Sequence, residues 1–335
     1  MLSPVLVLAT VAVGLVPAAA ELATARWPRR SPAAAIMLWQ AMGLGWGVAA
    51  IGTLAALGAD PEGSGVAGGA LTVLDRAVRN VTGEVRPPGL SAAMRLLCLG
   101  ASAALLALLC WVLIASTGAV LRDRRRHRAL LSLLAHGDPK VPGALVVDYP
   151  AAAAYCVPGL RSRIVISAGA LDLLDQAELA AVLAHERAHL RERHDLVLLP
   201  FTALARAFPW SVLVQRSYAS VALLVEMLAD DHAARRRPAR ELVTALIRVG
   251  AAGTPGTPAG TLAVADESSA EDESSAEDGG RAEGGDGPEG ESGVTARVER
   301  LLTPAPGLGL AARLLVCGTA AALVVVPAAL LVMPL

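Results

Sequence analysis

Four long apolar stretches dominate the pattern of hydrophobic and polar positions along the chain. They lie at about 2–21, 34–58, 92–121 and 308–333. Each is long enough for a membrane-crossing helix, which needs about 20 predominantly apolar residues. The pattern therefore predicts a multi-spanning α-helical membrane protein with about four spans.

The first stretch could instead be a signal peptide, because it ends in the small residues Ala18, Ala19 and Ala20. However, no basic segment precedes it, and a basic segment with Arg29 and Arg30 follows it. A signal peptide has the opposite arrangement. We therefore favour a helix that is retained in the membrane.

Basic residues beside the spans predict their orientation. The short loop 22–33 is basic, the segment 59–91 is nearly charge-balanced, and residues 122–128 form the strongest basic cluster of the chain. Cytoplasmic flanks of membrane spans carry an excess of Lys and Arg. We expect the N-terminus outside, residues 122–307 in the cytoplasm, and a multi-pass protein of the cell membrane. Because the cluster at 122–128 adjoins a span, we interpret it as a topology anchor and expect no direct nucleic-acid partner.

The segment from 122 to 250 has the pattern of a globular α+β domain. Short runs at 145–147 and 163–166 are rich in β-branched residues and lie near Pro and Gly, which indicates strands. Asp175, followed by Glu178 three residues later, resembles a capping box that opens a helix through about Asp195.

A further apolar stretch, 196–214, contains Arg206 and Pro209 in its middle. A charge and a helix breaker at mid-depth of a bilayer are both unfavourable. We therefore favour a buried or membrane-skimming helical hairpin over a fifth span. Another helix is expected at about 216–236.

Composition adds a third kind of segment. The chain is 54% hydrophobic, and its net charge of -1 averages a basic remainder with eleven acidic residues at 266–291. Acidic sequence rich in Ser and Gly cannot bury enough apolar surface to fold. We expect a disordered acidic linker and short connection at 251–307. The four cysteines suggest no disulfide framework.

The main chemical motif of the chain is His185-Glu186-Arg187-Ala188-His189. Two histidines four residues apart on a helix lie on the same face. Both imidazoles can then bind one zinc ion, and Glu186 can act as general base toward water on the metal. The motif predicts one Zn2+ per chain and peptide hydrolysis.

A third protein ligand is required, and two routes are open. In the long metzincin motif a Gly precedes a third ligand six residues past the second His, and here these positions hold Glu192 and Asp195. The second route uses Glu226 as ligand, with Asp230 one helical turn later hydrogen-bonding a ligating imidazole. We favour Glu226, because without the Gly the first helix should continue. His232 is a candidate transition-state stabiliser, or alternatively a solvated residue at a helix end.

Together these features resemble the BlaR/MecR antirepressor family of membrane zinc metallopeptidases, which is gluzincin-like, with HExxH and a distant ExxxD. Segments 155–159, 164–167 and 179–186 look like that family's approach to its active site. The chain also resembles heat-shock and prenyl-processing membrane peptidases. The resemblance implies a zincin-like fold, a zinc metalloendopeptidase activity (hydrolase, EC 3.4.24 type), ligands His185, His189 and Glu226, and the base Glu186. It also implies that the strand Arg163–Ser167 is the edge that pairs with substrate.

The chain departs from that family in ending at Leu335, just past the fourth stretch, so we expect no C-terminal sensor domain. We expect three N-terminal spans within 1–121, a peptidase domain at 122–250, and a last span at 308–335. The expected function is regulatory cleavage of a protein substrate such as a winged-helix repressor, without a small-molecule cofactor. The alternatives are a quality-control peptidase of the heat-shock type and a non-catalytic membrane transducer with a metal site.

Overall fold

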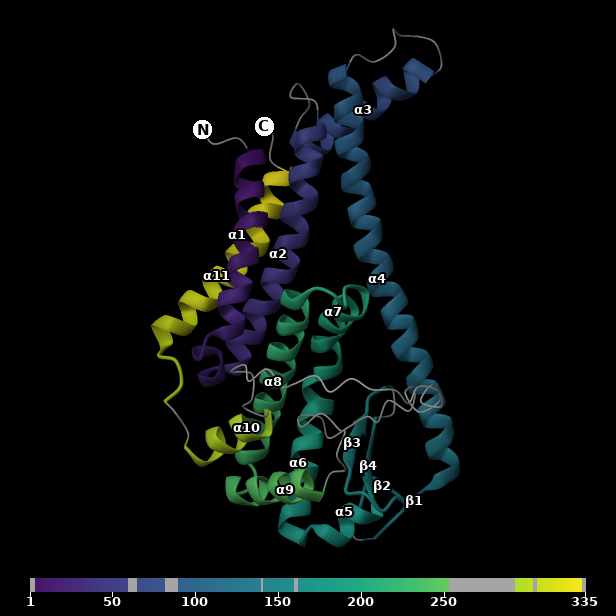
Figure 1. Ribbon diagram of the computed structural model, residues 1–335, viewed down its shortest axis with the longest axis vertical. Helices are drawn as coiled ribbons and strands as arrows, with labels where there is room; N and C mark the ends of the chain where they lie inside the picture. Colours follow the sequence, from purple (N-terminus) through teal and green to yellow (C-terminus); the bar gives the residue numbers. More distant parts are fainter. Residues whose placement is uncertain are drawn as a thin grey trace, which may run out of the picture. The chain divides into compact units, whose positions relative to one another are not determined.

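The computed structural model describes residues 4–59, 65–81, 90–139, 141–159, 162–252, 293–303 and 306–332 (Figure 1). The chain divides into two compact units. The first, here called the helical unit, comprises 1–121, 196–225 and 306–335. The second, the sheet unit, comprises 122–195 and 226–305.

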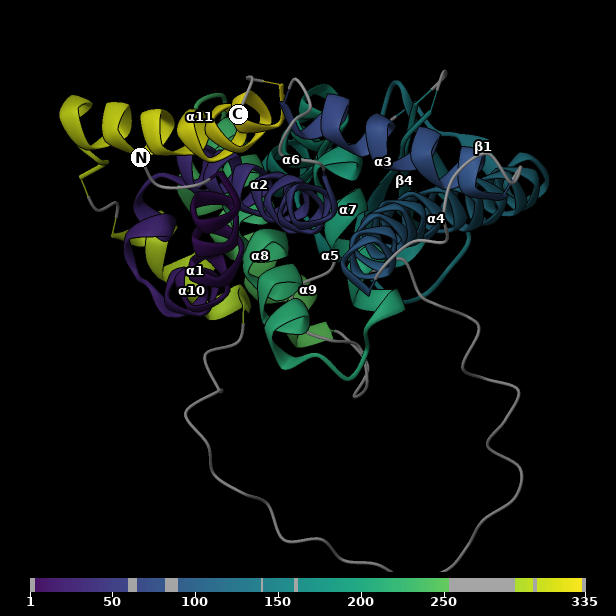
Figure 2. The same cartoon turned by 90° about the horizontal axis from the view of Figure 1, so that it is seen from above.

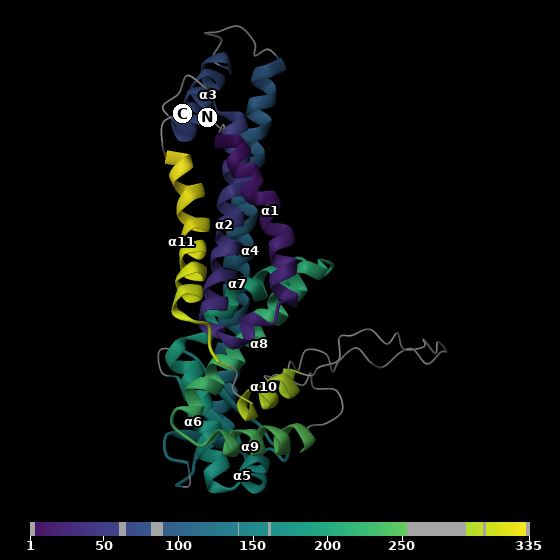
Figure 3. The same ribbon diagram turned by 90° about the vertical axis from the view of Figure 1, so that its left-hand side faces the viewer.

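The helical unit is built around α2 (Pro32–Gly58), which packs against α1 (Pro4–Thr24) on one side and α11 (Leu310–Val332) on the other (Figure 3). The start of α1 and the end of α11 lie at the same end of this bundle (Figure 1). Seen from above, α2 is nearly end-on whereas α11 crosses it obliquely (Figure 2). The unit also contains the 3-10 turn η1 (Trp27–Arg30), α3 (Gly65–Val81) and the first part of α4 (Leu90–Leu134).

All four predicted apolar stretches are helical over their described residues, except that the last helix begins at Leu310 rather than at 308. In the part of the chain that the structure describes, five helices are long and apolar enough to cross a membrane: α1, α2, 92–134 of α4, α8 and α11. The third helix does not end with its apolar stretch at 121. It continues to Leu134, so α4 extends from the helical unit into the sheet unit.

The stretch 196–214, predicted as a hairpin, contains most of α7 (His194–Ala207) and only the first residues of α8 (Val212–Ala234). The Gln40 side chain donates a hydrogen bond of 2.7 Å to the carbonyl of Val197, and Trp39 meets Phe201 edge-to-face. The α7 helix therefore packs on α2. The next helix was predicted to start at about 216, but α8 starts at Val212, and this longer α8 meets the length for a span.

A four-stranded mixed sheet forms one layer of the sheet unit. Its strands are β1 (Ala135–Gly137), β2 (Ala144–Val147), β3 (Ala154–Val157) and β4 (Arg163–Ser167), in the order β1-β2-β4-β3. The two predicted strands are confirmed as β2 and β4. However, the expectation that β4 is a free edge is wrong. It lies between β2, to which it is parallel, and β3, to which it is antiparallel, so the edge strands of the sheet are β1 and β3.

Alternating side chains of the sheet pack on two different helices. Ile164 and Ile166 join a cluster with Val182 of α6 (Gln176–Glu192). Val165, between them, joins Leu131 of α4 on the opposite face. Full burial of one such side chain contributes about 1.5–3 kcal/mol. The sheet is thereby fixed against α6, the helix that carries the HExxH motif.

The boundaries of α6 have local causes. Asp175 caps its start as predicted. Its side chain accepts hydrogen bonds from the backbone amides of Ala177 and Glu178, and the side chain of Glu178 accepts one from the backbone amide of Asp175. The predicted continuation to Asp195 is wrong. The helix ends at Glu192, because Arg193 adopts the left-handed conformation with φ 53° and ψ 45°. This is an αL cap with Arg in the place usually taken by Gly.

Helices α5 (Ala168–Leu173), α9 (Ala239–Ala252) and α10 (Gly293–Leu302) complete the sheet unit. The expected connection at 251–307 contains α10, which packs beside α9 (Figure 3). Val298 and Leu301 of α10 contact a cluster that includes Ala181 of α6 and Ala233 of α8. Residues 253–292, where most of the predicted acidic linker falls, lie outside the described residues.

Candidate metal centre and active site

His185 and His189 project from the same face of α6, one turn apart. Their Nε2 atoms lie 3.0 Å from each other. His185 is buried at 1% exposure, in the middle of the helix that packs on the sheet. The helix period thus brings two imidazole nitrogens to one point, as the sequence predicted.

Glu226 of α8 completes a group of three potential ligands. Its Oε2 lies 3.3 Å from Nε2 of His185, and its Oε1 lies 3.5 Å from Nε2 of His189. Ligands about 2.0–2.1 Å from a tetrahedral zinc ion lie about 3.3 Å apart. The three residues therefore fit zinc in both donor type and spacing, and they form a group that could hold a metal ion.

Asp195, the alternative ligand, is directed elsewhere. Its Oδ2 lies 3.0 Å from Nη1 of Arg124, near the end of α4. Because the left-handed Arg193 ends α6 before it, Asp195 belongs to the next helix. It is not a member of the His–His–Glu group.

Asp230, one turn after Glu226, lies behind His185. Its Oδ1 is 2.9 Å from Nδ1 of His185, and Asp230 is 1% exposed. Burial alone lowers the pKa of His185, but the hydrogen bonds and charges of Asp230 and Glu226 outweigh burial and raise the pKa to about 10. A positive charge, whether a proton or a metal ion, is therefore stabilised at this imidazole.

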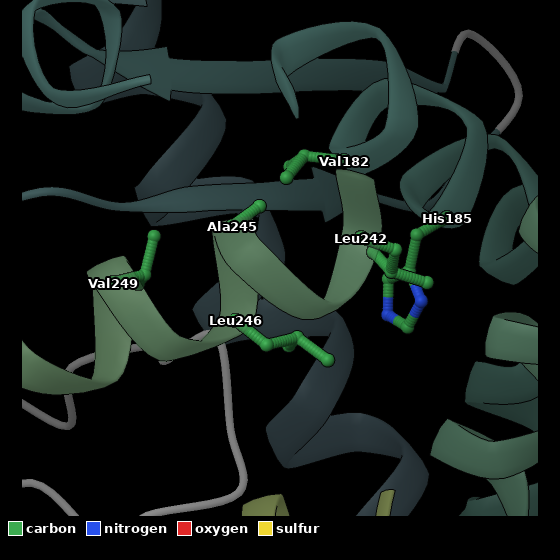
Figure 4. A pocket seen from close by; sticks show the side chains of 6 residues that line it. All are labelled: Val182, His185, Leu242, Ala245, Leu246 and Val249. Atoms are coloured by element: carbon green, nitrogen blue, oxygen red, sulfur yellow. The ribbon is translucent and has the colours of Figure 1, made fainter. Parts of the chain in front are cut away.

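An apolar wall shields the His185 ring from water. Figure 4 shows the ring from α6 beside Leu242 of α9, at a small hollow between the two helices. The other lining side chains are Val182, Ala245, Leu246 and Val249. Electrostatic interactions at His185 are stronger in such a dry environment.

His194 is a site residue that the sequence analysis did not assign. Its Nδ1 lies 3.0 Å from Nδ1 of His189, and it is 2% exposed. Burial lowers the pKa of His189 to about 3 and that of His194 to about 4, so both rings are neutral. The left-handed turn at Arg193 places His194 back against His189, and straight helical spacing gave no signal of this contact.

Arg297 of α10 is a second residue that the sequence analysis missed. It donates hydrogen bonds of 2.8 Å from Nε and Nη2 to the two carboxylate oxygens of Asp230, and its Nη1 lies 3.1 Å from Oε2 of Glu226. It is 1% exposed. The two carboxylates of α8 therefore share one buried guanidinium.

Glu186 follows His185 on α6, is buried, and interacts electrostatically with His185 and Glu226. Burial raises its pKa to about 7, the charge of His185 opposes this, and the charge of Glu226 adds to it. Its carboxyl group interacts with the Cys156 thiol of β3. Burial and the interaction with Glu186 raise the pKa of this thiol well above its usual range. Cys156 is thus a neutral thiol beside Glu186. A general base works best with a pKa near the operating pH.

His232, the candidate transition-state stabiliser, lies on the last turn of α8. Its Nδ1 is buried and has no hydrogen-bond partner among the described residues. A positive charge on His232 lowers the pKa of His194, so the two residues lie near each other, but His232 is not a member of the His–His–Glu group. The structure thus brings His185, Glu186, His189, Glu226 and Asp230 together, and leaves His232 beside them.

Residues 120–249 match the family model described as Peptidase family M48. No curated protein and no solved structure matches the chain. The matched range contains the HExxH helix, Glu226 and Asp230, and it ends before α10. The match over 120–249, the His–His–Glu group and the helices of membrane-spanning length together support a membrane-associated metallopeptidase with a domain similar to Peptidase family M48.

Proposed function

We propose that this protein is a membrane-bound zinc endopeptidase that hydrolyses peptide bonds of a cytoplasmic or membrane protein. One observation carries the proposal. The Nε2 atoms of His185 and His189 lie 3.0 Å apart, and each lies 3.3–3.5 Å from one carboxylate oxygen of Glu226, close to the buried carboxyl group of Glu186. Structural zinc sites are closed by four protein ligands, whereas catalytic sites keep a position open. Three protein ligands with an adjacent base favour catalysis over a purely structural metal.

Each residue then has a distinct task. Zinc, when bound, supplies a Lewis acid that polarises the scissile carbonyl group and acidifies water. Glu186 takes a proton from the attacking water and delivers it to the leaving amine. Asp230 accepts the Nδ1 proton of His185, which keeps the lone pair of Nε2 directed to the metal.

The substrate is proposed to bind in extended form along β3. The Ser167 amide donates to the carbonyl of Ala153, which marks these two residues as a hydrogen-bonded pair. Hydrogen-bonded pairs alternate along an antiparallel ladder. Tyr155 and Val157 therefore face β4, whereas the backbone groups of Ala154 and Cys156 face outward. An extended peptide can add a strand there by main-chain hydrogen bonds, next to the thiol that contacts Glu186.

The basic segment 122–128 supports a cytoplasmic sheet unit, and the resemblance to the antirepressor family favours a regulatory substrate such as a winged-helix repressor. A proteomic comparison of wild-type cells with a Glu186→Gln strain tests this role. Accumulation of one repressor-like protein is expected. Accumulation of many misfolded membrane proteins would instead indicate a quality-control peptidase.

The activity itself is tested with the purified full chain in detergent and an unfolded protein substrate. We expect about one zinc per chain, as in other catalytic zinc sites, and cleavage that a chelator removes and added zinc restores. Glu186→Gln should retain the metal and abolish cleavage. Glu192→Gln, an exposed change on the same helix, is the matched control. Cleavage by Glu186→Gln at the wild-type rate would refute the mechanism.

A further inference from the structure

Arg297 has contacts that docking of α10 does not require. The helix is already held by Val298 and Leu301, which pack on the cluster with Ala181 and Ala233. It is also held by Arg300, whose Nη1 and Nη2 bond the two oxygens of Asp231 at 2.6 and 2.8 Å. A buried guanidinium is costly to desolvate, and an apolar side chain would stabilise a helix contact as well. The position of Arg297 therefore calls for another explanation.

The guanidinium of Arg297 divides its donors between two carboxylates. Oδ1 of Asp230 is shared by Nη2 of Arg297 at 2.8 Å and Nδ1 of His185 at 2.9 Å. The remaining donor, Nη1, lies 3.1 Å from Oε2 of Glu226. Arg297 thereby fixes the orientation of both acidic residues of α8. The planar guanidinium allows this because its donors have a rigid fork geometry.

The contact of Arg297 with Glu226 is to Oε2, which also lies 3.3 Å from Nε2 of His185, whereas Oε1 lies 3.5 Å from Nε2 of His189. The guanidinium therefore competes with a metal ion for Oε2 and favours Oε1 as the one oxygen that binds it. A carboxylate that bound zinc through both oxygens would fill the position that a catalytic site keeps open. The positive charge of Arg297 also balances one of the two carboxylates. Without it, both negative charges would act on the metal and weaken it as a Lewis acid.

We propose that Arg297 is a positioning residue of the metal centre, which keeps Glu226 a single-oxygen ligand and directs Asp230 to His185. The inference rests on the proposed function, because it assumes a metal ion at His185, His189 and Glu226. It also means that α10 supplies part of the active centre. The residue that orders the α8 carboxylates is reached only after residues 253–292.

The test uses the purified full chain loaded with Co2+, whose visible absorption is stronger in four-coordinate than in higher-coordinate sites. Arg297→Gln should keep one Co2+ but absorb more weakly, and kcat of the zinc form should fall by about 10–100-fold, as is typical for residues behind metal ligands. Arg297→Lys keeps the charge without the fork and should remain impaired. Arg300→Gln removes an ion pair from the same helix and should match the wild type in both measurements.

Each other outcome has a defined meaning. A wild-type Co2+ spectrum and kcat in Arg297→Gln would overturn the inference while leaving the peptidase intact. Equal losses in Arg297→Gln and Arg300→Gln would also overturn it, since docking of α10 would then explain both. If Arg297→Gln does not fold, the Arg297→Lys variant tests the inference instead. Full activity of Arg297→Lys would show that the fork geometry of the guanidinium is not needed, and would overturn the inference. A wild-type chain that binds no Co2+ would instead refute the proposed function.

Discussion

Replacement of Asp230 by Ala should destabilise the sheet unit far more than replacement of its neighbour Asp231. Both residues lie on α8 and both pair with an arginine of α10. Asp230 and Arg297 are each 1% exposed, whereas the side chains of Asp231 and Arg300 are 29% and 19% exposed. The two substitutions thus remove similar ion pairs that differ mainly in burial.

The expected magnitudes follow from this difference. Breaking a buried pair leaves an uncompensated charge and typically costs about 3–5 kcal/mol. Because Arg297 keeps its contact with Glu226, we expect Asp230→Ala to lie near the lower end, at about 3 kcal/mol. Arg300 can be rehydrated when Asp231 is replaced, so that loss should be about 0–1 kcal/mol. Adding Arg297→Leu to Asp230→Ala should recover part of the lost stability, since the double variant no longer buries an incompletely paired guanidinium, although Glu226 loses its contact with Arg297.

Hydrogen exchange of the α6 amides in the metal-free protein measures this effect, because it reports opening of the sheet unit alone. A single global unfolding free energy is not well defined for a chain with two units. Similar losses for Asp230→Ala and Asp231→Ala would refute the reasoning. The reasoning would also be refuted if the double variant, Asp230→Ala with Arg297→Leu, lost as much stability as the two single variants together.

Three further substitutions test other parts of the site. Glu226→Ala should abolish high-affinity zinc binding whereas Asp195→Ala should retain it, as measured by competition with a chromogenic chelator; the reverse result would make Asp195 the ligand. His194→Leu should weaken zinc binding by about 10–100-fold, because His189 loses the partner of its Nδ1 proton. His194→Asn keeps a hydrogen-bond acceptor and should largely restore binding, and equal losses in both variants would exclude the contact as the cause. Ala154→Pro removes one outward-facing amide of β3 and should raise KM about fivefold with little change in kcat, since one hydrogen bond contributes about 1 kcal/mol; an unchanged KM would argue against pairing at this edge.

Local rules predicted the parts of the site that lie on regular helices. The i, i+4 spacing places His185 and His189 on one face, and the same spacing relates Glu226 to Asp230. The capping box at Asp175 likewise depends on residues within one turn and is confirmed. These features need only the helix period, which the sequence shows directly.

The missed features depend on contacts between distant segments or on an unusual backbone conformation. His194 reaches His189 only because Arg193, not a Gly, adopts a left-handed conformation. Arg297 acts across the interval 253–292, and no local spacing connects it to α8. The strands β1 and β3 are short and lack the run of β-branched residues that marks β2 and β4. The only indication of an edge strand is then the family resemblance, which implies β4.

The position of α10 has a practical consequence for recombinant work. A fragment bounded by the family match, 120–249, would contain every ligand of the proposed metal centre but not Arg297. Asp230 and Glu226 would then lie buried without their counterion, and the apolar surface that Val298 and Leu301 cover would be exposed to solvent. Such a truncated domain should express poorly or aggregate, and its inactivity would say nothing about the activity of the full chain. Coexpression with a peptide of α10 should restore its solubility.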